Sequence, residues 1–276
     1  MKIPKARIPQ HLDRIHDSKS TPVWFSVYVE NFLAYVRGKD VHFEYDRDKQ
    51  LIRVKEQSTS YYFLNRSRGF TLYRNGLKAR GEFLFKSYCL QNVSFAQSDV
   101  VIDCGANSGD LFLEMESRIL EMNYIAIEPS LKDFNILQLN VKNATLLNIA
   151  LGEENGEVDF YLSTAGADSS LIEPKNWTEK TKSKVRRLDS LLAEMAIKKV
   201  KLVKIEAEGF EPEVLYGLTG ALKYIEFIAV DGGPERGKFE CQTFSDCSNF
   251  LITNGFKMID TYLPWNRALF KNTLIE

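Results

Sequence analysis

An acidic residue followed by a glycine turn ends the first long apolar run of the sequence. Residues 100–102 have the pattern of a buried strand, Asp103 follows them, and Gly105 and Gly109 allow the backbone to approach a ligand closely. Asn107 lies between the two glycines, and apolar residues at roughly helical spacing follow the turn. This order is typical of a nucleotide-binding connection, although a plain glycine-containing turn has the same pattern when it is considered alone.

The chemistry of this turn favours a ligand without phosphate. The turn lacks the pattern Gly-x-Gly-x-x-Gly, and the carboxylate of Asp103 would repel a pyrophosphate at the helix N-terminus. S-adenosylmethionine has no phosphate, its ammonium group suits a carboxylate, and its ribose hydroxyls suit a second acid. Glu128 ends the next predicted strand, about 20 residues or a little more beyond the turn, where Rossmann-like folds place a ribose-binding carboxylate. We therefore expect S-adenosylmethionine as the cofactor.

Three further acids follow predicted strands of the same sheet. Ligands of open parallel sheets bind at the carboxyl ends of the strands. We therefore expect Glu206, Glu208 and Asp231 at the same edge of the sheet as the cofactor. One interpretation makes Glu206 or Asp231 a general base whose pKa is raised by neighbouring like charges. The other makes these acids ligands of Mg²⁺, which would lower the pKa of an acceptor hydroxyl. The sequence leaves both open, and its three histidines all precede this region.

Composition argues against several classes of partner. With 276 residues, 44% of them hydrophobic, the chain is long enough for one large domain and an extension. A formal net charge of −1 gives no basic field that would favour nucleic acid. Residues 1–20 are polar and lack the apolar core of a secretory signal, and the apolar run 23–36 is too short to span a bilayer. We therefore expect a cytoplasmic protein without a transmembrane segment, in which residues 23–36 form a packed helix.

The pattern of short runs divides the chain into two regions. Three strand-like runs between residues 41 and 73 predict a small α+β extension over residues 1–80. Over residues 81–276, strands and helices alternate, which predicts a mostly parallel sheet with helices on both faces. A short turn joins the last two strands, so the final strand should run antiparallel.

These patterns together predict an α/β chain with a Rossmann-like, seven-stranded, mostly parallel sheet whose last strand is antiparallel. The expected strands are 100–103, 124–128, 145–150, 201–205, 224–230, 256–262 and 267–271. The expected helices lie near 110–121, 130–141, 186–196, 211–222 and 243–254. Residues 157–162 and 168–172 are expected to form an additional hairpin between the third and fourth strands.

Several short motifs occur in an order that is specific to one family. They are Gly81-Glu-Phe, Val101-Ile-Asp-Cys-Gly-Ala-Asn-Ser-Gly109, Glu128-Pro129, Ala150-Leu-Gly-Glu153 with Gly156, Ser169-Ser-Leu171, Leu188-Asp-Ser-Leu191 and Val203-Lys-Ile-Glu-Ala-Glu-Gly-Phe-Glu211. On these residues, the segment 80–272 resembles the FkbM-type family of S-adenosylmethionine-dependent methyltransferases, whose class I fold it is expected to share.

The resemblance implies methyl transfer to a hydroxyl, commonly on a sugar of a surface glycan or on a polyketide-type product. A role in polysaccharide biosynthesis follows from the first of these. The resemblance also implies cofactor positions, which are Asp103, Gly105, Asn107, Gly109 and Glu128, with Glu82 reaching the same site from outside the sheet.

One motif departs from the family pattern. The family usually has Lys-Ile-Asp-Val-Glu-Gly, whereas this chain has Lys204-Ile-Glu-Ala-Glu-Gly209. The extra methylene of Glu206 moves its carboxylate by about a bond length, and displacements on that scale matter at a reacting centre.

Three hypotheses about function follow from these features. The first is an O-methyltransferase that acts on a sugar hydroxyl activated by carboxylates or by a carboxylate-bound metal. The alternative is a cofactor-binding but inactive scaffold of a glycan-assembly system, and a nicotinamide-dependent oxidoreductase rests on fold analogy alone. The expected partner is a small-molecule or glycan acceptor, and the chain is a candidate homo-oligomer.

Overall fold

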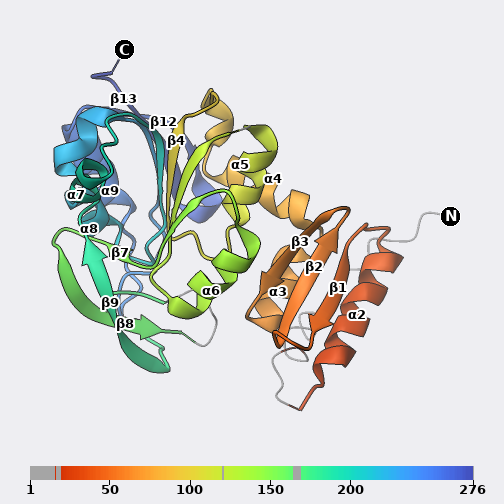
Figure 1. The fold of residues 1–276 in the computed structure, drawn as a ribbon. Coiled ribbons are helices and arrows are strands. Elements are labelled where there is room, and N and C mark those ends of the chain that lie inside the picture. Colours follow the sequence, from red (N-terminus) through yellow and green to blue (C-terminus); the bar gives the residue numbers. More distant parts are fainter. Residues whose placement is uncertain (1–15, 17–19, 120, 164–168, 276) are drawn as a thin grey trace. The chain divides into compact units, whose positions relative to one another are not determined.

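The computed structural model describes residue 16 and residues 20–119, 121–163 and 169–275 (Figure 1). Contacts between Cα atoms divide the chain into two compact units, Met1–Glu82 and Phe83–Glu276, which are described separately. The segment 1–20, in which no secretory core is expected, lies outside the described residues except for His16 and Ser20. No helix in the described part of the chain is both long enough and apolar enough to cross a membrane.

The first unit is a three-stranded antiparallel sheet with helices beside it. Its elements are α2 (Val23–Val36), β1 (His42–Asp46), β2 (Leu51–Glu56), β3 (Thr59–Phe63), α3 (Arg66–Tyr73) and the start of α4 (Leu77–Ser87). Four buried aromatic residues form the core between sheet and helices, and they are Phe43, Phe63, Phe70 and Tyr73. Burial of large rings supplies much of the apolar area that a unit of this size needs.

The second unit is built on a seven-stranded sheet in the order β12-β13-β11-β10-β4-β5-β6. The strands are β4 (Val100–Cys104), β5 (Asn123–Ile127), β6 (Thr145–Leu147), β10 (Val200–Ile205), β11 (Ile225–Asp231), β12 (Phe256–Tyr262) and β13 (Arg267–Asn272). Only β13 runs antiparallel to its neighbours, which confirms the predicted Rossmann-like α/β fold. The chain moves outward from β4 to β6 and then crosses to β10, so the switch point, where such sheets bind ligands, lies between β4 and β10.

Helices cover both faces of this sheet (Figure 1). One face packs against α4, α5 (Asp110–Arg118) and α6 (Leu131–Asn140) through an apolar cluster that includes Phe112, Met115 and Leu137. The other packs against α7 (Leu188–Glu194), α8 (Glu211–Tyr216) and α9 (Phe244–Thr253) through a second cluster. The central strands are nearly continuous runs of buried apolar residues because they are covered on both sides.

A smaller sheet, here called the flap, lies between β6 and β10 in the sequence. It has the order β7-β9-β8, from β7 (Ala150–Leu151), β8 (Gly156–Leu162) and β9 (Glu179–Arg186). The expectation of a hairpin between 157–162 and 168–172 was wrong about the second strand, because β8 pairs along its length with β9. Residues 164–168 lie outside the described part, and Ser170 makes only an isolated bridge to Tyr161.

Candidate active site

The glycine turn between β4 and α5 packs closely against the backbone at the ends of β5 and β10. Gly105 and Gly109 have φ values of 77° and 91°, and Asn107 also has a positive φ, of 46°. The backbone N–H of Gly105 donates to the carbonyl of Ile127 at 2.9 Å. A Cβ atom on Gly105 would lie 1.9 Å from the backbone oxygen of Glu206, so only glycine fits at this position.

We therefore expect Gly105→Ala to be strongly destabilising, because the added methyl group collides with backbone at a positive φ. The loss should exceed about 2 kcal/mol, measured by urea unfolding. Gly156→Ala is the matched control, because no atom lies within 4 Å of a Cβ built there. An equal effect of the two substitutions would show that the turn has room to adjust.

Glu128 connects this turn to the end of β5. Its side chain is only 6% exposed. Oε2 accepts the backbone N–H of Asn107 at 2.9 Å, and Oε1 accepts that of Ser130 at 2.8 Å. Burial, reinforced by the charge of Asp133, raises the pKa of Glu128 to about 8. Each carboxylate oxygen has two acceptor positions, so one on each oxygen remains for the hydroxyls of a ligand.

Five alternating charges lie along one edge of the sheet, at the carboxyl ends of β4, β10 and β11 and at the start of the antiparallel β13, and we call them the charge array. Lys204 Nζ lies 3.0 Å from Asp103 Oδ1 and 2.9 Å from Glu206 Oε2. Arg267 then bridges two acids, with Nη2 2.8 Å from Glu206 Oε1 and Nε 2.7 Å from Asp231 Oδ2. The structure thus brings three of the predicted acids together. The carboxylate of Glu206 pairs with both cations at once.

The two cations of the array are almost completely buried and were not identified as site residues from the sequence. Lys204 and Arg267 are each 3% exposed. Lys204 lies opposite Asp103 in the register of β10 with β4, and Arg267 lies opposite Asp231 in the register of β13 with β11. Lys204 belongs to a motif shared with the family, so it could have been found. Arg267 follows a turn and has no local pattern that distinguishes it.

A serine and a tyrosine at the end of α4 support the guanidinium group of Arg267. Arg267 Nη1 donates to Ser87 Oγ at 2.6 Å. The guanidinium carbon lies 4.2 Å from the centre of the Tyr88 ring, which is a cation–π contact. These contacts hold the arginine fork in one orientation, so its remaining donors face the two carboxylates.

The array has opposite effects on the pKa values of its acids. Burial alone would raise the pKa of Glu206, but Lys204 and Arg267 outweigh burial and hold it well below its usual range. The pKa of Asp231 is raised instead, first by burial and then by the negative charge of Glu206. Glu206 therefore stays ionised and suits a structural and electrostatic role, whereas Asp231 is better suited to exchange a proton.

Glu235 is a further acid beside Asp231 that sequence reasoning missed. It follows the turn in which the N–H of Gly233 donates to Asp231 Oδ1 at 3.1 Å. A Cβ atom on Gly233 would lie 2.3 Å from Glu235 Oε1, so the carboxylate of Glu235 is folded against that glycine. Burial, together with the charges of Asp231, Glu211 and Glu206, raises the pKa of Glu235 to about 8. In the described part of the chain, no lysine, arginine or histidine forms an ion pair with it.

The other two predicted acids, Glu208 and Glu82, are not members of the charge array as defined above. Glu208 has a positive φ of 50° in the turn after β10, and its backbone carbonyl accepts from Ser170 Oγ at 2.8 Å. Glu211 fixes this turn, because its Oε1 accepts the N–H groups of Ala207 and Gly209. Glu82 is the last residue of the first unit, and its contact with a cofactor stays a prediction.

The acids of the site do not fit the alternative in which they bind Mg²⁺. Among the described residues, no group of three or more His, Cys, Asp or Glu side chains is placed to hold a metal ion. The carboxylates of Glu206 and Asp231 are instead paired with Lys204 and Arg267. A cation bound there would have to displace these buried partners, so we derive no step through a metal.

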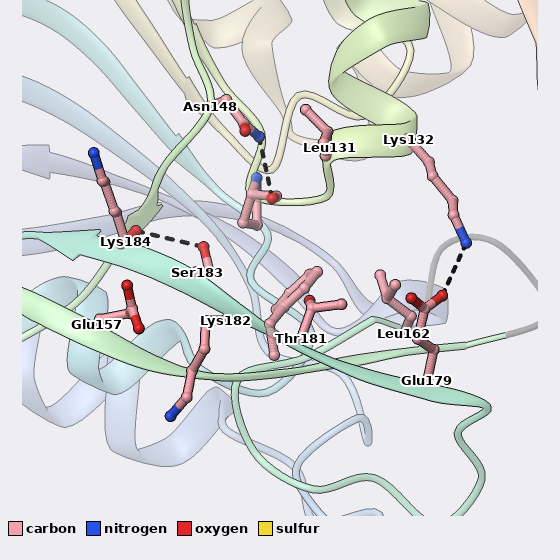
Figure 2. Close-up of a pocket in the computed structure, with 12 residues that line it drawn as sticks. Leu131, Lys132, Asn148, Glu157, Leu162, Glu179, Thr181, Lys182, Ser183 and Lys184 are labelled. Carbon is pink, nitrogen blue, oxygen red and sulfur yellow. Dashed lines mark hydrogen bonds and ion pairs between the residues drawn. The ribbon is translucent and has the colours of Figure 1, made fainter.

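A cavity of about 470 Å³ lies beside Glu128, between the start of α6 and the flap (Figure 2). Pro129, Leu131 and Asn148 line it on one side, and flap residues that include Phe160 and Thr181 line it on the other. Asn148 donates to the carbonyl oxygens of Glu128 and Pro129, at 2.8 and 3.1 Å. This side-chain amide fixes the backbone that connects Glu128 to the cavity wall.

Comparison with known proteins finds several that are named as methyltransferases. A family model described as "Methyltransferase FkbM domain" matches residues 103–264. "Methyltransferase 1" of Beauveria bassiana is 26% identical over 66% of this chain and 86% of its own length. "Hexuronic acid methyltransferase AglP" of Haloferax volcanii is 29% identical over 49% of this chain, which spans 56% of that protein. The crystal structure of methyltransferase FkbM from Methylobacillus flagellatus KT superimposes with a TM-score of 0.47 at 15% identity, covering 74% of this chain and 53% of that one.

Proposed function

This chain belongs to the family of methyltransferase FkbM domains, and we propose that it uses S-adenosylmethionine to methylate a sugar hydroxyl. The main structural observation behind the proposal is the charge array beside the glycine turn. Asp231 of the array ends β11, and Glu235 lies in the turn that follows, at the edge where a parallel sheet binds its ligands. The turn itself suits a ligand that approaches the backbone.

The residues around the turn fit S-adenosylmethionine, which when bound supplies a methyl group on a positively charged sulfur. Glu128 keeps acceptor positions that suit the two ribose hydroxyls. Oδ1 of Asp103 is buried, and Lys204 Nζ, 3.0 Å away, is its ion-pair partner among the described residues. We assign Asp103, Gly105, Asn107 and Gly109 to the amino acid end of the cofactor. The cavity beside Pro129 has a size typical of ligand sites and suits the adenine base.

In this proposal Glu235 or Asp231 removes the proton of the acceptor, and Glu206 has a different role. The acceptor hydroxyl must lose its proton as its oxygen takes the methyl group, and a base is most effective when its pKa is near the working pH. Glu235 and Asp231 meet that condition better than Glu206, whose pKa is lowered by its two cations. Glu206 instead orients Arg267, which leaves Glu208 as a candidate contact of the acceptor near the flap.

The proposed acceptor is a sugar, by similarity to a relative named for its action on hexuronic acid. That relative is 29% identical over about half of this chain, so the acceptor stays a proposal. A screen with radiolabelled S-adenosylmethionine should therefore begin with glycans that contain uronic acid. A genomic neighbourhood rich in glycosyltransferases would support a role in polysaccharide biosynthesis.

Calorimetric titration with S-adenosylhomocysteine tests the cofactor site before any acceptor is known. We expect micromolar binding to the natural chain and binding about 10- to 100-fold weaker for Glu128→Gln, because the amide has one oxygen acceptor where the carboxyl group has two to serve the turn and the ribose hydroxyls. Glu154→Gln is the control, since Glu154 is an exposed acid that does not line the cavity. NADH should give no heat.

The outcomes of this titration separate the hypotheses. If the natural chain does not bind S-adenosylhomocysteine, the proposed cofactor is wrong. If it binds tightly but methylates no acceptor in the screen, the inactive scaffold becomes the better interpretation. Micromolar binding of NADH would support an oxidoreductase.

A further inference from the structure

Helix α2 has its polar residues on the inside and its aromatic residues on the outside. Ser26, Glu30 and Ala34 are its buried residues. Oε1 of Glu30 lies 3.0 Å from His16 Nε2, and Asn31 exchanges two hydrogen bonds with the backbone of Phe43, at 2.9 and 2.7 Å. These polar contacts within the first unit fix the rotation of the helix about its axis.

The opposite side of α2 is a continuous stripe of rings, which we call the aromatic face. Its members are Trp24, Phe25, Tyr28, Phe32 and Tyr35, which are 67%, 39%, 65%, 56% and 82% exposed. Residues three and four apart lie next to one another on a helix, so these side chains adjoin. The sequence prediction of a helix over 23–36 was right, but the prediction that it is packed was wrong for this face. Exposed apolar patches of this kind mark interaction sites.

The chemistry of the aromatic face favours a second copy of this chain as its partner. Helices that lie on membranes carry lysine and arginine on an exposed polar side, whereas α2 contains neither residue and buries its polar side. The face has no charge that would call for a complementary charge on a different protein. A neutral stripe can pair with itself about a two-fold axis, which is the commonest symmetry of protein dimers.

The exposed area is sufficient for such a pairing. A covered aromatic side chain buries about 150–250 Å², so five rings at these exposures offer roughly 600 Å² per copy. Two copies would bury about 1,200 Å² in total, which is the lower limit for specific interfaces. We propose that α2 packs antiparallel against α2 of a second copy and that the chain forms a dimer with a micromolar dissociation constant.

Charge substitutions at the middle of the face test this proposal with the full chain. Sedimentation velocity should show a monomer–dimer equilibrium, and Tyr28→Glu and Tyr28→Lys should each weaken it by about tenfold or more. An equimolar mixture of the two variants should dimerise again, since opposite charges then meet near the axis. Phe239→Glu is the control, because Phe239 is 90% exposed in the second unit. Unchanged thermal unfolding of each variant would confirm that the fold is intact.

Several results would overturn the proposal. One is a natural chain that stays monomeric up to a concentration of about 100 µM, which is well above the micromolar dissociation constant proposed for the dimer. A second is failure of the mixed variants to associate. A third is a monomer that binds vesicles of phosphatidylcholine and phosphatidylglycerol and loses that binding in Tyr28→Glu, which would identify a lipid surface as the partner.

Discussion

Replacement of Glu235 by glutamine should lower kcat by about 10²- to 10⁴-fold, the usual contribution of a general base. The carboxylate of Glu235 lies beside Asp231 with no cation paired to it in the described residues, and its pKa is raised to about 8. The proton must leave this group before it can accept one from a hydroxyl. The rate should therefore rise with pH and level off above about 8. This rise, the ascending limb of the pH–rate profile, should be absent in Glu235→Gln.

The pH profile distinguishes a base from a residue that only shapes the site. Asp231→Asn removes a like charge that raises the pKa of Glu235, so in that variant the limb should move to lower pH. Binding of S-adenosylhomocysteine should be unchanged in both variants. Glu240→Gln is the control, because Glu240 lies in an exposed segment of the same connection. An unaltered limb in Glu235→Gln would exclude Glu235 as the titrating base.

Much of the fold and three of the five members of the charge array follow from the sequence, because both depend on where strands end. Apolar runs fix where β4, β10 and β11 lie, and the acid after each run must then stand at the carboxyl edge of the sheet. Asp103, Glu206 and Asp231 were located in this way, and the structure places all three on the charge array.

The basic residues and the exposed helix face could not be predicted in the same way. Arg267 meets Asp231 through the register of β13 with β11, which are separated in the sequence by α9, β12 and a turn, and no local pattern encodes that register. The lysines of β9 alternate with small polar residues, which resembles a solvated segment more than a strand. Apolar content alone could not show that α2 turns its rings outward, because its orientation depends on Asn31 and Glu30 binding partners distant in sequence.

Arg267→Met should destabilise the second unit by about 3–5 kcal/mol, because it leaves two carboxylates in a buried region without their shared cation. Methionine keeps much of the side-chain volume, so the loss of stability comes mainly from the missing charge and only to a small extent from a cavity. The melting temperature should fall by roughly 10 °C for a domain of this size. Arg186→Met removes an exposed ion pair with Glu194 and should change stability by less than about 1 kcal/mol.

The pH dependence of this loss tests whether charge is its cause. The pKa of Glu206 is lowered in the folded chain, so its contribution to stability is present above its unfolded pKa and is lost as pH falls through the lower folded value. In Arg267→Met, Glu206 and Asp231 would protonate more readily, because the cation that favours their ionised forms is gone. The difference in unfolding free energy between the natural chain and the variant should therefore be largest near pH 8 and shrink towards pH 4.5. A difference that stays constant with pH would instead assign the role of Arg267 to packing against Tyr88.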